Sequence, residues 1–309
     1  MTDIATLADR ASQGDPRSLG RLITIVENGG SGVRELAATM ASRTGVAQVV
    51  GLTGSPGVGK STTTTALVTA FRERGKRVAV LAVDPSSPFT GGAILGDRVR
   101  MQEHALDPDV YIRSMSSRGQ LGGLAAATPQ AVRVLEACGF DVVLIETVGV
   151  GQAEVEIAGL ADTTLVLLAP GMGDGIQAVK AGILEVADVF VINKADREGA
   201  DITFRDIRSM MALIQREANE WRQPIVKTVA HRSEGVDDLV AAIDKHHSWL
   251  AEHGELELKR LVRARAEVQA IVLGELSRRF AVPEEVAAAV AAGDVDPYTA
   301  ADRVLGDTS

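Results

Sequence analysis

A glycine-rich segment at residues 54–61, with the sequence GSPGVGKS, fits the phosphate-loop pattern G-x-x-x-x-G-K-[ST] at every fixed position. Glycines allow several backbone N–H groups to point toward one centre, where they bind phosphate oxygens. The lysine of such a loop reaches the β- and γ-phosphates, and the serine hydroxyl binds Mg²⁺. We predict a nucleoside triphosphate site formed by Gly54, Ser55, Pro56, Gly57, Val58, Gly59, Lys60, Ser61 and Thr62, with Lys60 as a catalytic residue and Ser61 as a metal ligand.

A second motif, Asn193-Lys194-Ala195-Asp196, follows an apolar run and matches the N-K-x-D pattern of proteins that bind guanine. The Asp196 carboxylate can accept two hydrogen bonds from the guanine edge, whereas adenine would leave it unpaired at a cost in binding. The aliphatic part of Lys194 can lie along the base. Asn193 is expected to connect this loop to the phosphate loop. The motif favours GTP over ATP.

The segment Thr228-Val229-Ala230 occupies the place where many GTPases have a Ser-Ala pair. A backbone N–H of that pair contacts the guanine oxygen. We therefore include Val229 and Ala230 among the predicted nucleotide-binding residues, although the match to the pair is imperfect.

An apolar run at 141–147 carries Glu146 near its end, and Gly149 follows three residues later. In phosphate-loop enzymes this place holds the acid that supports Mg²⁺, usually an aspartate. Glu146 is therefore our candidate for a catalytic and metal-supporting residue. The Gly149 N–H is expected to contact the γ-phosphate, so the loop after it should change shape on hydrolysis.

Ras-like GTPases place a water-orienting glutamine directly after this glycine, but here Val150 stands there and Gln152 lies two residues further on. Gln152 is a candidate catalytic residue, and a solvated position at a helix start is the alternative. We predict slow intrinsic hydrolysis that depends on a group from a partner or a rearranged loop.

Two further aspartates precede the acid at Glu146. Asp84 closes a strand-like run and is well placed to reach Mg²⁺ or its waters. Asp97 lies in 90–100, which fits a first switch loop, where it could bind Mg²⁺ or orient water, or be a plain charge on a helix face. A glycine-rich loop at 170–180, with Asp174, Gln177 and Lys180, is a hypothetical partner-sensing loop.

The composition limits the class of protein. The chain has 309 residues, 46% of them hydrophobic and 3% aromatic, so its core must be aliphatic. A net charge of −9 argues against nucleic-acid and anionic-membrane partners, which require basic surface. The one cysteine, Cys138, excludes an internal disulfide and is expected to be a buried, inert thiol. With no signal-like or membrane-spanning run, we expect a cytoplasmic protein.

Strand-like and helix-like runs alternate through the middle of the chain. Most of the strand-like runs are continuously apolar, as in strands covered on both faces of a parallel sheet. They lie at 46–53, 77–83, 110–114, 141–147, 163–169, 187–192 and 224–229. We predict an α/β fold with a doubly wound, mainly parallel sheet, of the phosphate-loop NTPase type. A helix at 61–73 and the lack of an antiparallel hairpin after it favour the class of signal-recognition and metallochaperone GTPases over the Ras-like class.

The two ends of the chain have a different pattern. Residues 1–44 are predicted as a helical extension, 45–232 as the GTPase domain and 233–309 as a second helical extension. The last segment carries an apolar stripe that would pack on the parent domain or on a second subunit. The stripe consists of Leu258, Leu261, Val262, Val268, Ile271 and Val272.

Over nearly its whole length the chain resembles the MeaB/ArgK family of GTPases, also labelled LAO/AO transport ATPases. The resemblance rests on the phosphate loop, the turn after Val83, Gly96-Asp97-Arg98, the run 146–152, the run 171–177, the Asn193 motif and the tail at 296–302. Glu146 in place of Asp is characteristic of that family.

The resemblance implies a homodimeric enzyme that hydrolyses GTP to GDP and phosphate. Such a protein binds adenosylcobalamin-dependent methylmalonyl-CoA mutase, gates loading of its cofactor and protects it from inactivation. By the same resemblance Asp97 and Glu146 are functional residues, and 171–180 is a switch with Asp174 and Lys180 involved. The helical tail becomes the dimerisation arm.

Two alternatives stay open at this point. One is a transport-linked ATPase or kinase, which the Asn193 motif and the absence of a membrane segment argue against. The other is a metallochaperone GTPase, which would need a Cys/His cluster. The chain has five histidines, and the adjacent pair His246-His247 is expected on a solvated helix.

Overall fold

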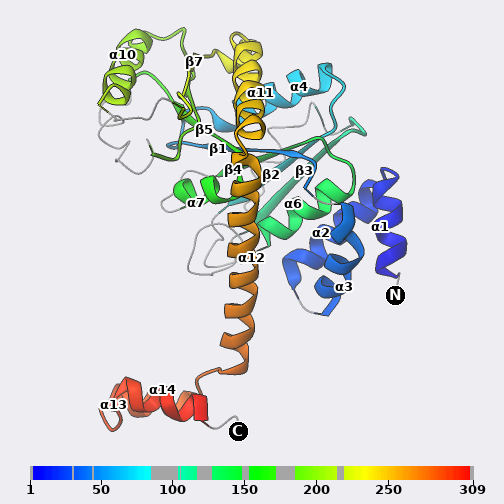
Figure 1. Cartoon of the computed structure of the whole chain (residues 1–309), viewed down its shortest axis with the longest axis vertical. Coiled ribbons are helices and arrows are strands. Elements are labelled where there is room, and N and C mark those ends of the chain that lie inside the picture. Colours follow the sequence, from blue (N-terminus) through cyan, green and yellow to red (C-terminus); the bar gives the residue numbers. More distant parts are fainter. Residues whose placement is uncertain are drawn as a thin grey trace. The chain divides into compact units, whose positions relative to one another are not determined.

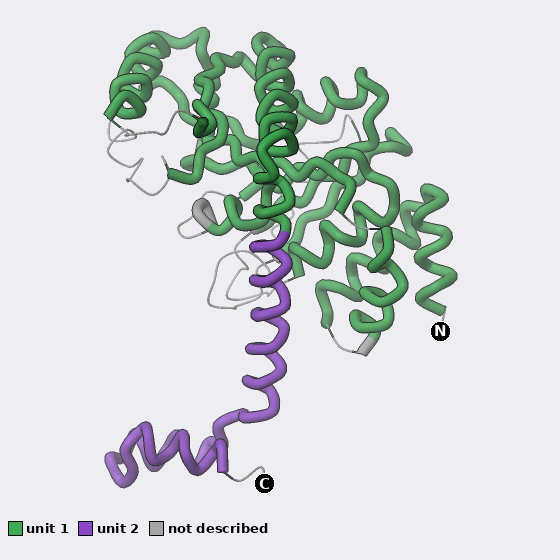
Figure 2. The backbone as a smooth tube through the Cα atoms, in the orientation of Figure 1, with its two compact units in different colours: residues 1–260 green, residues 261–309 purple. Residues whose placement is uncertain are grey.

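The computed structural model describes residues 3–29, 31–43, 45–84, 104, 106–116, 127–147, 153–171, 185–213 and 219–306. The side chains of residues 31, 84, 116 and 153–155 are not described. The chain divides into two compact units, residues 1–260 and 261–309 (Figure 2). The domain boundaries predicted at 44/45 and 232/233 stay predictions.

The first unit is built on a seven-stranded sheet with the strand order β3-β2-β4-β1-β5-β6-β7 (Figure 1). Every strand pairs in parallel with its neighbours. The strands are β1 (Gln48–Thr53), β2 (Val78–Asp84), β3 (Val110–Ser116), β4 (Val142–Thr147), β5 (Thr163–Leu168), β6 (Val189–Ile192) and β7 (Ile225–Lys227). Each predicted strand is present, and β2 is parallel to both neighbours, so the predicted α/β fold is confirmed.

Helices cover both faces of this sheet because alternate strand residues point to opposite sides. Val142 and Leu144 of β4 pack with α4 (Lys60–Glu73) and α11 (Val236–Glu252). Val143 and Ile145 face the other way. On that side lie α1 (Ile4–Ser12), α2 (Pro16–Asn28), α3 (Ser31–Met40), α6 (Thr128–Ala137) and α7 (Ala153–Leu160), and α10 (Ala200–Met211) packs on β5 and β6.

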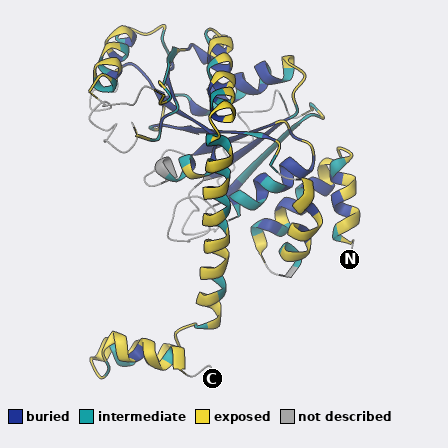
Figure 3. Ribbon diagram, in the orientation of Figure 1, coloured by how far each residue is buried: buried dark blue, intermediate teal, exposed yellow. Residues whose placement is uncertain are grey.

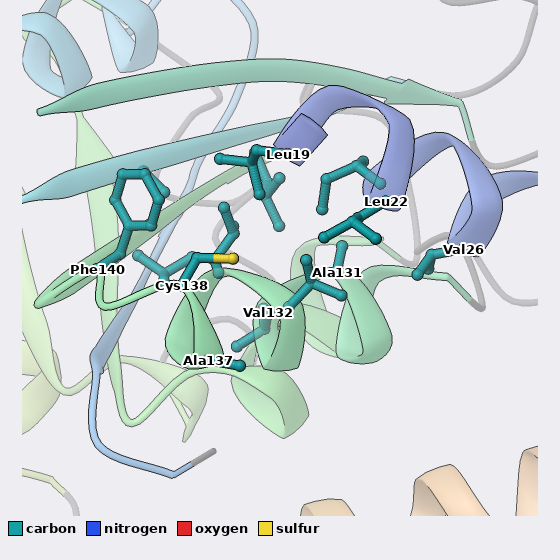
Figure 4. Close-up of a cluster of buried hydrophobic side chains, with 14 of the residues drawn as sticks. Leu19, Leu22, Val26, Ala131, Val132, Ala137, Cys138 and Phe140 are labelled. Carbon is teal, nitrogen blue, oxygen red and sulfur yellow. The ribbon is translucent and has the colours of Figure 1, made fainter. Parts of the chain in front are cut away.

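The N-terminal helices belong to this core. Asp15 begins α2 by accepting hydrogen bonds from the backbone N–H groups of Arg17 and Ser18, and Pro16 occupies the first turn, where its missing N–H costs nothing. Leu19 and Leu22 of α2 then pack with residues of α6 and with Cys138 (Figure 4). Burial raises the pKa of the Cys138 thiol to about 11, so the prediction of an inert thiol is confirmed.

Helix α12 (Glu255–Arg279) has two different parts. Its first residues are held in the first unit: Lys259 Nζ donates to the Asp162 carbonyl at 3.0 Å and lies 3.2 Å from Asp188 Oδ2. Arg260 donates to the Ala47 carbonyl at 3.0 Å and pairs with Asp162. Beyond Arg260 the apolar residues of the helix are exposed (Figure 3). The second unit continues with α13 (Glu284–Ala292) and α14 (Pro297–Gly306).

His246 lies in a buried cluster at the start of β5 and β6, so the prediction that it is on a solvated helix face was wrong. Only 1% of its surface is exposed. Its Nδ1 lies 2.9 Å from Thr163 Oγ1 and its Nε2 3.3 Å from Asp188 Oδ1. The rings of Trp221 and Trp249 lie against it. Burial, with a smaller contribution from Lys259, lowers the pKa of His246 to about 3, and burial also raises the pKa of Asp188.

This cluster predicts a stability loss in mild acid. The unfolded chain takes up a proton at His246 below its ordinary pKa of 6.5, but the folded chain does not until about 3, so falling pH favours unfolding. Between pH 7 and pH 5 this single group should cost ~2 kcal/mol of the free energy of unfolding. The raised pKa of Asp188 acts in the opposite direction, because the folded chain then takes up its proton first.

The prediction is measured by urea unfolding of the wild type and His246→Gln at both pH values. The two tryptophans of the chain report the transition, since both contact His246. We expect the variant to lose less stability on acidification than the wild type, and His247→Gln to behave like the wild type. Equal pH dependence in wild type and His246→Gln would contradict the argument.

Candidate nucleotide-binding site

The phosphate loop connects the buried end of β1 to the start of α4 and packs tightly on two neighbouring segments. Gly54 has φ +141° and a Cβ there would lie 2.3 Å from the Leu167 carbonyl oxygen. Gly59 has φ +97° and its Cβ would lie 2.3 Å from Asn193 Nδ2. Neither contact is possible for a residue with a side chain, so the glycines are required by the surroundings as well as by the backbone conformation.

Lys60 is the first residue of α4, and its side chain turns back over the loop. Its Nζ donates to the carbonyl oxygens of Gly54 at 2.6 Å and Ser55 at 3.2 Å, and only 7% of the residue is exposed. Val58 is fully buried and fixes the loop to the core beneath it. The ammonium group and the positive end of α4 are therefore directed to the same place, which suits a phosphate group.

Glu146 reaches this place from β4, which lies next to β1. One carboxylate oxygen accepts from Ser61 Oγ at 2.6 Å and the other from Thr64 Oγ1 at 3.0 Å. The residue is 5% exposed. Sequence reasoning missed Thr64, although a hydroxyl three residues after Ser61 lies on the same helix face. A serine hydroxyl beside a buried carboxylate is an oxygen set that fits Mg²⁺.

For the other residues predicted around the phosphates, the structure describes either the backbone alone or no part of the residue. Asp84 ends β2, where its backbone is paired with Ser116 of β3, but its side chain is not described. Asp97, Gly149 and Gln152 lie outside the described residues. So do Asp174, Gln177 and Lys180 of the predicted switch loop.

Asn193, which directly follows β6, connects three loops through one buried side chain. Its Nδ2 donates to the Val58 carbonyl of the phosphate loop at 2.9 Å. Its Oδ1 accepts from the Ala230 backbone N–H at 3.1 Å and from Thr228 Oγ1 at 3.3 Å. Ala230 thus helps to hold Asn193, and its contact with guanine stays a prediction. The role of Thr228 was not foreseen from the sequence.

Lys194 and Asp196 follow Asn193 in the same loop. Lys194 has φ +57°, a conformation rare for residues other than glycine, and its Nζ donates to the Gly57 carbonyl at 2.5 Å. Its stem therefore runs from the Asn193 loop to the phosphate loop. The Asp196 side chain is 34% exposed, and its carboxylate lies 3.7 Å from the guanidinium of Arg232. Val229, between Thr228 and Ala230, is buried.

The parallel sheet, with a phosphate loop after β1 and flanking helices on both faces, defines a phosphate-loop NTPase fold. A solved structure named as an LAO/AO transport system kinase is similar, with a TM-score of 0.73, 27% identity and coverage of 99% of this chain and 98% of the other. A protein of Pyrococcus abyssi, named a GTPase by inference, is 47% identical over 98% of this chain and 96% of its own.

The mouse protein named "Methylmalonic aciduria type A homolog, mitochondrial" is 34% identical over 95% of this chain and 76% of its own. Residues 19–285 match the family described as "Methylmalonyl Co-A mutase-associated GTPase MeaB". The chain belongs to this family of GTPases, as its motifs predicted. Membership of this family implies GTP and GDP as bound nucleotides.

Among the described residues, every helix is too short or too polar to span a bilayer. The cytoplasmic location stays a prediction, since the name of the mouse relative places that protein in the mitochondrion.

The close contact at Gly59 gives a test of the site's packing. Gly59→Ala should destabilise the fold more than Gly57→Ala, although both replace a glycine of positive φ. A Cβ at Gly57 meets nothing within 4 Å, so only the conformational cost of ~1–2 kcal/mol applies there. At Gly59 the overlap with Asn193 adds a further ~1–3 kcal/mol.

Thermal unfolding of the two variants measures this difference directly. Equal melting temperatures would mean that Asn193 can move aside without loss, and would contradict the tight coupling of the two loops.

Proposed function

We propose that this chain hydrolyses GTP to GDP and phosphate with the help of Mg²⁺, in the service of an adenosylcobalamin-dependent methylmalonyl-CoA mutase. It gates loading of the mutase cofactor and protects the mutase from inactivation. The observation that supports the first part best is the Asn193 side chain, which joins the Lys60 loop to the base-binding loop. The description of the matched family supports the second part.

In this proposal the described residues have distinct tasks. The backbone of residues 54–59 and the start of α4 bind phosphate oxygens, and Lys60 leaves its loop carbonyls to neutralise charge on the β- and γ-phosphates. Mg²⁺, when bound, neutralises phosphate charge as a Lewis acid. Ser61 would hold the ion through its hydroxyl. Glu146 would orient that hydroxyl or the water molecules bound to the ion.

The residues proposed to complete hydrolysis are those of the sequence prediction: Asp84 and Asp97 near the metal, Gly149 at the γ-phosphate and Gln152 near the attacking water. Thr62 is proposed to contact the phosphates from the first turn of α4. Because Gln152 does not occupy the place used by Ras-like GTPases, we propose slow intrinsic turnover that a partner accelerates.

We also propose a homodimer formed through the arm beyond Arg260. Three apolar residues of α12, Leu261, Val262 and Val268, are 57–60% exposed, which is unusual for such a set on one helix. An acidic chain with this surface is proposed to bind protein partners, and neither nucleic acid nor membrane. Sedimentation of the purified chain measures its oligomeric state. A monomer at micromolar concentration would contradict the proposed homodimer.

The proposal that Asp196 binds guanine is tested by substituting this residue. Asp196→Asn should weaken GTP binding and admit xanthosine triphosphate, because xanthine offers an acceptor where guanine has an amino group. The unpaired edge should cost ~1–3 kcal/mol of GTP binding, which is a loss of about 5- to 150-fold in affinity. Competition against a fluorescent guanine nucleotide measures both affinities. Unchanged GTP affinity would contradict the assignment, and tight ATP binding would favour the transport-linked alternative.

The partner assignment is tested by GTP turnover, alone and with purified methylmalonyl-CoA mutase. We expect slow release of phosphate alone and a clear acceleration by the mutase, both abolished in Lys60→Ala. An adenosylcobalamin-dependent mutase for a different substrate is the matched control. No response to methylmalonyl-CoA mutase would leave the GTPase assignment standing and overturn the partner.

A further inference from the structure

Arg232 lies beside the carboxylate that is proposed to bind guanine. Its Nη2 is 3.7 Å from Asp196 Oδ2 and also donates to Glu234 Oε2 at 3.5 Å, and its Nε is 3.0 Å from Glu234 Oε1. The guanidinium is thus placed between two carboxylates, one of them the base-binding group. Neither the N-K-x-D pattern nor the phosphate-loop pattern includes this residue.

The segment that carries Arg232 is a tight turn stabilised by its own backbone hydrogen bonds. Arg232 belongs to the short 3₁₀ helix η3 (Ala230–Arg232), and its N–H donates to the Val229 carbonyl at 2.9 Å. The Val229 N–H in turn donates to the Glu234 carbonyl at 3.0 Å. Because the first residue of η3 also bonds to Asn193, the position of Arg232 is set by the same buried amide that holds the base-binding loop.

The carboxylate has room for both partners. An ionised Asp side chain offers about four lone-pair sites, and the guanine edge uses two of them. A cation on Asp196 Oδ2 can therefore remain while the base binds. Docking of the base removes water from the carboxylate, which is costly for an unpaired charge and less so for a paired one.

Val229 carries no hydroxyl, so its side chain cannot donate a hydrogen bond to Asp196. We propose that Arg232 is a positioning and specificity-determining residue that orients Asp196 toward the N1–H and N2–H₂ donors of guanine. This inference rests on the proposed GTP function. The Arg232 and Asp196 side chains are 48% and 34% exposed, so the pair should contribute little to folding and more to base discrimination.

The first experiment compares Arg232→Ala with Arg197→Ala, which removes the same charge from the exposed part of the base-binding loop. Competition titrations give the affinities for GTP and for ITP, whose base lacks the 2-amino group. Arg232→Ala should lose ~3- to 10-fold in GTP affinity and less in ITP affinity, with an unchanged melting temperature. Arg232→Lys should retain part of the discrimination, and Arg197→Ala all of it.

The second experiment asks whether Arg232 acts through Asp196. In the Asp196→Asn background, adding Arg232→Ala should leave the affinity for xanthosine triphosphate unchanged within about twofold. An equal loss in both backgrounds would show that Arg232 contacts the nucleotide itself and would overturn the proposal. So would an unchanged GTP/ITP ratio in Arg232→Ala. Failure of the wild-type chain to bind GTP would instead contradict the proposed function on which the inference rests.

Discussion

One buried amide, that of Asn193, sets the geometry on which the nucleotide site depends. Its Nδ2 and Oδ1 together bond to the phosphate loop, to the Ala230 backbone and to Thr228. Since a buried amide that loses a partner costs ~1–3 kcal/mol, the three loops are held together as a unit. The requirement for glycine at position 59 follows from the same contact, because a larger residue there would occupy the space of the amide.

The parallel sheet brings the chemistry to one edge. Strands β4 and β1 are neighbours, so Glu146 at the end of one reaches Ser61 and Thr64 on the helix that follows the other. Strands β5 and β6 continue the row and place Asn193 next to the phosphate loop. Burial on both faces makes the strands rigid, and a rigid edge is what a preorganised phosphate site needs.

The first residues of α12 are bound at the other ends of these strands, where β5 and β6 begin. Asp162 and Asp188 directly precede β5 and β6, and they accept hydrogen bonds from the backbone N–H groups of Val49 and Thr164. Lys259 and Arg260 balance these carboxylates, which would otherwise be costly to bury. Arg260 is the last residue of the first unit, and the large apolar residues that follow it on α12 are exposed.

The amino-acid sequence alone determined the parallel α/β fold, the phosphate loop and the base-binding motif, because each depends on local patterns: continuous apolar runs, glycines at fixed spacing and a short polar motif after a strand. It also indicated Glu146 as a candidate metal-supporting residue, since its place near the end of an apolar run is a local feature. Thr64, Thr228, Arg232 and the burial of His246 were decided by the tertiary structure. Their partners lie tens of residues away in the chain, and only the packing of strands and helices shows which side chains meet.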